Sequence, residues 1–156
     1  MADILDRPAA STSRAATTGD RRVGVIGTLV VVAGVLLALS GAGTWAVVQT
    51  NLAGEGITVA EDASWLAGEK VDGPLTAYAE TDIIAQHTLK IGGGKTYAEL
   101  DRADPVRATV MNGSFLRASL FTSVVSFGIA AMAMGLGVVF VLMGFALRAI
   151  GYPRTA

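Results

Sequence analysis

Residues 118–147 read ASLFTSVVSFGIAAMAMGLGVVFVLMGFAL, a stretch without a single charged side chain. A helix needs about 20 apolar residues to cross the roughly 30 Å hydrocarbon core of a bilayer. At about 1.5 Å per residue this stretch is about 45 Å long, so it spans only with a tilt or with a protruding end. Helices in soluble cores rarely continue this far without a charged face. The stretch therefore predicts a transmembrane helix.

A second charge-free stretch, residues 23–48, comes earlier in the chain. The alternative is a cleaved signal peptide, because Arg21 and Arg22 precede it and Ala38-Leu39-Ser40 resembles a cleavage site. Signal peptides, however, have apolar regions of only about 7–15 residues. We therefore predict a retained span. The expected fold class is an all-α membrane protein, a two-helix transmembrane antiparallel hairpin with a mostly helical extracytoplasmic segment.

The composition agrees with a membrane protein. The chain is 52% hydrophobic and 16% charged, whereas soluble domains carry about 25% charged residues. The net charge of −1 gives no sign of a nucleic-acid partner. There is no cysteine, which excludes disulfides, thiolate metal sites and a cysteine nucleophile.

Basic residues near the spans predict the orientation, because cytoplasmic flanks are enriched in Lys and Arg. Arg14, Arg21 and Arg22 precede the first span, and no Lys or Arg occurs in residues 51–69 after it. We expect a multi-pass protein of the cell membrane with both termini in the cytoplasm. The predicted parts are a disordered cytoplasmic tail (1–22), transmembrane helix 1 (23–48), an extracytoplasmic helical segment (49–117), transmembrane helix 2 (118–147) and a cytoplasmic tail (148–156).

Helix signals recur in the extracytoplasmic segment. Gly73-Pro74 predicts a helix start, and the glycines at 92–94 predict its end. Thr96 and Glu99 form a capping-box pattern that predicts another helix. Asp104-Pro105 predicts a further start, from which helix continues into the second span, with a weak point at Asn112-Gly113.

Gly94-Lys95-Thr96 resembles the end of a nucleotide-binding P-loop. That motif requires another glycine five positions before Gly94, where this chain has Leu89. A helix end followed by a helix start explains the same residues, so we predict no nucleotide binding.

No catalytic, cofactor-binding or metal-binding residue is predicted. His87 is the only histidine and is expected to be exposed, and a facial-triad iron site needs two histidines and a carboxylate. Glu61-Asp62 and Asp101–Asp104 lack the spacing of a calcium loop. No ionisable residue lies within either span, which disfavours a pump or a coupled transporter.

Small residues form a stripe on each span, and such stripes mark helix contacts in lipid. The predicted helix-packing seam consists of Gly27, Gly34, Ala38 and Gly41 on the first span and Ser126, Ala130, Ala133, Gly137 and Gly144 on the second. Counting from the span ends sets Gly34 and Ala133 at comparable depth. The predicted partners are the lipid bilayer and either a membrane protein or a second copy of the chain.

Several motifs together resemble a family of small actinobacterial membrane proteins, often labelled "aromatic ring-opening dioxygenase LigA", over residues 24–150. They are TVAEDA (58–63), GPLTAYA (73–79), GGKTYAEL (93–100), DPVR (104–107) and SFLRASL (114–120). The label implies a dioxygenase subunit. No catalytic residue is carried over, because the chain has two spans and one histidine, whereas that subunit is soluble.

The favoured function is a non-enzymatic structural or accessory protein that presents its extracytoplasmic helices to a partner. The alternatives are a dioxygenase-related subunit, as the label implies, and an oligomeric two-span channel.

Overall fold

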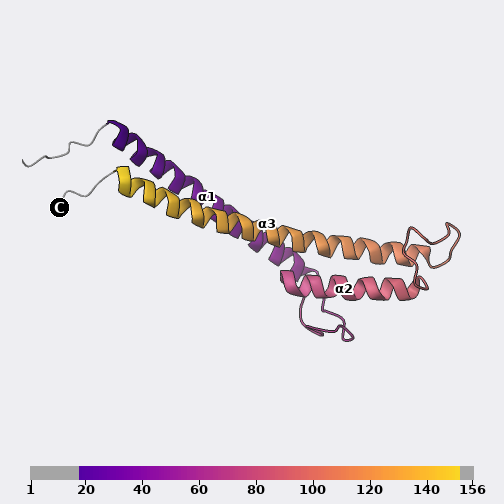
Figure 1. The fold of residues 1–156 in the computed structure, drawn as a ribbon. Coiled ribbons are helices and arrows are strands. Elements are labelled where there is room, and N and C mark those ends of the chain that lie inside the picture. Colours follow the sequence, from indigo (N-terminus) through magenta and orange to yellow (C-terminus); the bar gives the residue numbers. More distant parts are fainter. Residues whose placement is uncertain (1–17, 152–156) are drawn as a thin grey trace, which may run out of the picture.

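Residues 18–151, the part of the chain that the computed structural model describes, contain three α-helices joined by two non-helical segments (Figure 1). The helices are α1 (Thr18–Gly54), α2 (Pro74–Ile91) and α3 (Arg107–Gly151). Within these residues there is no strand, only an isolated antiparallel bridge between Thr58 and Lys70. The predicted all-α class is confirmed. The tail predictions for residues 1–17 and 152–156 lie outside the described residues.

Both long helices extend beyond the charge-free stretches that identified them. α1 has 37 residues and α3 has 45, so α3 is about 67 Å long at about 1.5 Å per residue. Residues 18–22, expected in a disordered tail, form the first turn of α1. Charged residues such as arginine and lysine are good helix formers. Charge therefore limits what can enter lipid but does not end a helix.

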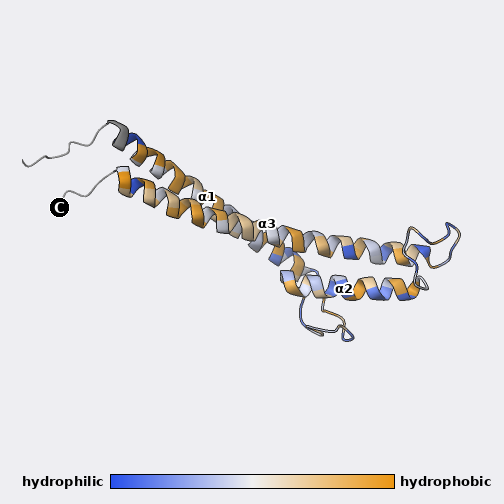
Figure 2. Ribbon diagram, viewed as in Figure 1, coloured by the Kyte–Doolittle hydropathy of each residue, from blue (hydrophilic) through white to orange (hydrophobic). Residues whose placement is uncertain are grey.

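The two long helices pack against each other, and α2 packs against the N-terminal part of α3 beyond the end of α1 (Figure 1). Hydrophobic residues dominate the length that α1 and α3 share, whereas polar residues are frequent in α2 and in the connecting segments (Figure 2). Two helices, Arg21–Gly54 and Arg107–Gly151, are long and apolar enough to cross a membrane.

α2 begins and ends where the sequence predicts. Pro74 is its first residue, and the Thr76 hydroxyl accepts a hydrogen bond from the Gly73 N–H at 3.2 Å. Gly92 caps the other end, and Gly93 and Gly94 have φ angles of 61° and 84°. Positive φ angles favour glycine because it has no Cβ. The P-loop-like residues are therefore a helix end.

The segment predicted to be extracytoplasmic is less helical than expected. Residues 55–73 and 92–106 form turns and loops. Glu99 accepts hydrogen bonds from the backbone N–H and the hydroxyl of Thr96, each at 2.8 Å, yet no helix follows. The reason is that Pro105 disfavours helical geometry just before it, and the few residues left cannot offset the cost of starting a helix.

The predicted weak point at Asn112-Gly113 is also wrong, because α3 continues through it without a break. A Cβ at Gly113 would lie only 2.3 Å from the Thr88 hydroxyl oxygen of α2. Gly113 is thus the position where α2 approaches α3 closely. Tertiary packing here outweighs the low helix propensity of glycine.

A hydrophobic core forms where the end of α1, the start of α2 and the middle of α3 meet. Its buried members come from all three helices and from the 55–73 segment: Leu52, Val59, Val71, Ala77, Ala79, Leu120 and Phe127. Trp45 and Leu66 pack against this core. The core fixes α2 and the 55–73 segment onto the end of the long helix pair.

Candidate functional site

The predicted seam residues on α1 lie against the backbone of α3. Gly27, Gly34 and Gly41 are buried. A Cβ added to Gly34 would lie 2.7 Å from the Gly137 carbonyl oxygen, and one on Gly41 would lie 2.7 Å from the Ala130 carbonyl oxygen. Cβ atoms essentially never approach other heavy atoms closer than 3.0 Å. There is therefore no room for even a methyl group at these positions.

The glycines of α3 show the same contacts from the other side. A Cβ on Gly137 would lie 2.6 Å from the Gly34 carbonyl oxygen and 2.8 Å from the Ala38 Cβ. A Cβ on Gly144 would lie 2.6 Å from the Gly27 carbonyl oxygen. The contacts pair residues in opposite chain order along the two helices. Such close backbone approach allows Cα–H···O contacts and dense packing without side chains.

Two members of the predicted seam lie away from these closest contacts. Ala133 is half-buried, and the residue opposite Gly34 is Gly137, one turn further along α3 than the predicted partner. Counting from the span ends misjudged the depth because the second stretch protrudes. Ser126 is half-buried and lines a cleft beside Val48, and its hydroxyl donates to the Thr122 carbonyl oxygen.

An aromatic pair outside the predicted small-residue stripes continues the contact beyond the glycines. Trp45 and Phe127 meet edge to face, with ring centroids 4.7 Å apart. Phe127 is only 1% exposed. Its position one turn before Ala130 on the same face is the sequence signal for this contact, because residues three apart share a helix face.

The 55–73 segment is fastened to α2 by two carboxylates. Glu80 is buried and accepts a hydrogen bond from the Ala60 N–H at 2.9 Å. Asp62 accepts one from the His87 ring at 2.7 Å between Nε2 and Oδ2. This hydrogen bond lowers the pKa of Asp62 below its usual value. His87 is therefore not simply solvated, although the pair is largely exposed and contributes little to stability.

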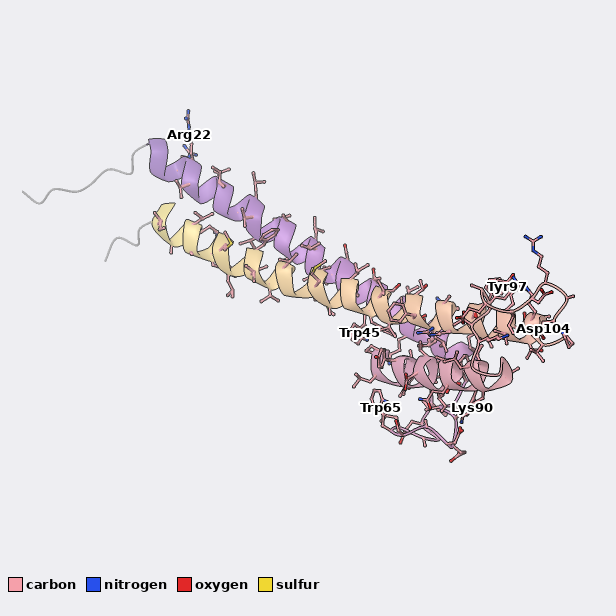
Figure 3. All side chains as sticks on the ribbon, turned by 45° about the vertical axis from the view of Figure 1, so that its right-hand side comes forward. Arg22, Trp45, Trp65, Lys90, Tyr97 and Asp104 are labelled. Atoms are coloured by element: carbon pink, nitrogen blue, oxygen red, sulfur yellow. The ribbon has the colours of Figure 1, made fainter. Side chains whose placement is uncertain are left out.

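The second connecting segment is held by Arg107 at the start of α3. The guanidinium donates hydrogen bonds to the carbonyl oxygens of Tyr97 and Leu100 and lies 4.1 Å from the centre of the Tyr97 ring. Figure 3 places Tyr97 and Asp104 together in this segment, at the opposite end of the molecule from Arg22. Both outer segments are thus ordered by side-chain contacts.

Within residues 18–151 no group of three or more His, Cys, Asp or Glu side chains is arranged to hold a metal ion. The carboxylates considered from the sequence have other contacts. Besides the Asp62–His87 pair, Asp101 accepts a hydrogen bond from the Ala103 N–H and Asp104 accepts one from the Val106 N–H. These last two contacts shape the turn that precedes α3.

No protein-family model, curated protein or solved structure matches the chain. The family resemblance of the sequence motifs stays an expectation, and any function is inferred from the geometry of the chain itself.

Proposed function

We propose that the chain is a two-span membrane protein, an antiparallel transmembrane hairpin that presents a small extracytoplasmic helical module to a partner. The observation that carries the membrane placement is the exposure of apolar side chains. Leu29, Leu36, Leu39 and Leu142 are each more than 60% exposed. Only 17% of the most hydropathic window of either long helix is buried. Continuous apolar surface of this extent is unusual on a soluble monomer.

The register of the two helices supports the same placement. Gly27 lies beside Arg148, whose Cγ would be 2.9 Å from a Cβ at that glycine. Arg148 is therefore at the level of the α1 start, near Arg21 and Arg22. At the other end, Glu55 and Leu116 line one cleft, and Arg117 follows directly. The charge-free parts of α1 and α3 thus coincide in height, as a common hydrocarbon layer requires.

Aromatic residues support an outer boundary near Trp45. Trp45, Leu66 and Ala77 belong to or pack against one core, which brings the neighbouring Trp65 and Tyr78 to a similar level. The rings of Trp65 and Tyr78 are 6.3 Å apart, and Figure 3 shows Trp65 on the same side of the outer module as Trp45. Tryptophan and tyrosine are enriched at membrane interfaces. From Arg22 to Trp45 is about 35 Å of helix, close to the roughly 30 Å hydrocarbon thickness.

Labelling with a membrane-impermeant maleimide on intact cells tests the topology, and the absence of native cysteines makes single-cysteine variants straightforward. Gln86→Cys is exposed on α2 and is expected to be labelled. Arg22→Cys is expected to be labelled only after the cells are opened, because positively charged flanks stay in the cytoplasm. Leu142→Cys, in the proposed hydrocarbon layer, is the control that resists both treatments. Labelling of Arg22→Cys in intact cells would mean that the orientation is opposite to the one proposed.

A partner is proposed because apolar side chains stay uncovered beyond the proposed hydrocarbon layer. Phe115 is 64% exposed and lies in the N-terminal part of α3, which extends past the end of α1 (Figure 1). Large exposed apolar residues outside lipid mark contact surfaces. The glycine faces, in contrast, are covered within one chain, which favours an accessory protein over a channel assembled through those faces.

Photo-crosslinking tests the partner in native membranes. Benzoylphenylalanine at Phe115 is expected to yield one discrete crosslinked species, because a phenyl ketone replaces an aromatic ring that a partner covers. The same group at Gln86, which is exposed on α2, is the control and should yield none. Equal, diffuse crosslinking at both positions would argue against a specific partner at Phe115. A crosslinked species of twice the chain mass would identify a second copy as the partner.

A further inference from the structure

A cleft of about 360 Å³ opens between the outer end of α1 and α3. This volume is within the range of about 300–1,000 Å³ that small-molecule sites occupy. Apolar side chains, among them Val48 and Leu52, form part of its wall. Asn51 and four hydroxyl-bearing side chains of α3 also line it: Ser119, Thr122, Ser123 and Ser126. The cleft lies just beyond Trp45, at the level that the proposed membrane placement assigns to lipid headgroups.

Three of these hydroxyls have already used their only proton. Thr122 donates to the Ala118 carbonyl oxygen at 2.8 Å and Ser126 donates to the Thr122 carbonyl oxygen at 2.8 Å. Ser123 donates to the Ser119 carbonyl oxygen at 3.4 Å. A hydroxyl has one donor and two acceptor lone pairs. The lone pairs are what these groups can still offer, so they suit a ligand that brings hydrogen-bond donors.

The charge of the cleft selects a cation. Glu55 is the only charged side chain in its lining. Within residues 18–151 its carboxylate makes no hydrogen bond and no ion pair, and it is exposed at the end of α1. The C-terminal end of a helix also carries partial negative charge. A cation at this position would therefore be attracted by both the carboxylate and the helix end.

We propose that this cleft binds the primary ammonium group of a phospholipid headgroup, as in phosphatidylethanolamine, with Glu55 as its counter-ion. The inference rests on the proposed membrane placement, which brings lipid headgroups to this level. A primary ammonium carries three N–H donors, which match the carboxylate and the hydroxyl lone pairs. A trimethylated choline headgroup has the same charge but no N–H, so it cannot make these hydrogen bonds.

Native mass spectrometry of the detergent-solubilised full chain tests the site with equal amounts of phosphatidylethanolamine and phosphatidylcholine. We expect about tenfold more bound phosphatidylethanolamine, in line with the strength of a charge-assisted hydrogen bond. Glu55→Gln should abolish this preference. Glu69→Gln, which neutralises an exposed acid outside the cleft, should keep it. Equal binding of the two lipids by the unmodified chain, a comparison that needs no variant, would overturn the proposal, as would a preference that survives Glu55→Gln.

A soluble competitor separates a lipid from a free amine. Glycerophosphoethanolamine should compete at least about tenfold less well than the lipid, because it lacks the acyl chains, whose apolar surface contributes to binding of the lipid. Equal competition would overturn the assignment to a lipid. Failure of the membrane placement is distinguishable, since the protein would then stay in solution without detergent. A detergent-requiring protein with no lipid preference would refute the cleft alone.

Discussion

Replacing Gly137 by leucine is expected to destabilise the detergent-solubilised protein by about 3 kcal/mol, the upper end of what overpacking usually costs. A Cβ at this position would lie 2.6 Å from the backbone nitrogen of Ala38 and 2.6 Å from the Gly34 carbonyl oxygen. Backbone cannot move aside as a flexible side chain can, so α1 and α3 must separate. Unfolding followed by circular dichroism measures the loss.

The matched control is Gly135→Leu, two residues away in the same helix. No atom lies within 4 Å of a Cβ at Gly135, so leucine there meets open space and removes a poor helix former. Its free energy of unfolding should be unchanged or slightly higher. On α1, Gly34→Leu and Gly43→Leu form the same kind of pair. If Gly135→Leu costs as much as Gly137→Leu, the destabilisation comes from loss of glycine and not from the helix contact.

Phe127→Ala is expected to lower the free energy of unfolding by about 3–5 kcal/mol, the usual cost of removing a buried phenyl ring. Phe127 is 1% exposed and belongs to the core that joins all three helices. Its edge-to-face contact with Trp45 adds a specific aromatic interaction. The chain has two tryptophans, so fluorescence measured in a Trp65→Phe background reports the change around Trp45.

Phe145→Ala provides the comparison, since Phe145 is on the same helix but 54% exposed. Its ring faces outward, and its removal should cost less than about 1 kcal/mol and leave Trp45 fluorescence unchanged. A similar loss for both variants would mean that α3 depends on phenylalanine at any position and not on the core around Phe127.

Local signals in the sequence were sufficient to locate the three helices along the chain. The charge-free stretches identified α1 and α3, and the bounds of α2 followed from Pro74 and the glycines at 92–94. These features act through neighbours in the chain, which is why they can be recognised without a structure. The exact ends of α1 and α3 were not predictable, because charged residues continue a helix outside lipid as readily as they begin a loop.

Contacts between distant parts of the chain could not be predicted from the sequence. Nothing local indicates that Glu80 accepts a hydrogen bond from the Ala60 N–H or that Gly113 faces Thr88. The capping pattern at Thr96 was recognised correctly as a set of hydrogen bonds but overvalued as a helix start. The small-residue stripes indicated which faces of the two spans are in contact. The register between the two helices, however, also depends on the hydrophobic core around Phe127.

The glycine contacts restrict how the two long helices can move relative to each other. Gly144 accommodates Val31, and Gly137 accommodates Ala38. A slip of α3 by one turn in one direction would put Phe140 or Val141 in the place of Gly144, and in the other it would put Val141 in the place of Gly137. Either step forces a bulky side chain against backbone. Sliding of one helix along the other is therefore blocked, whereas rigid tilting of the pair leaves these contacts in place.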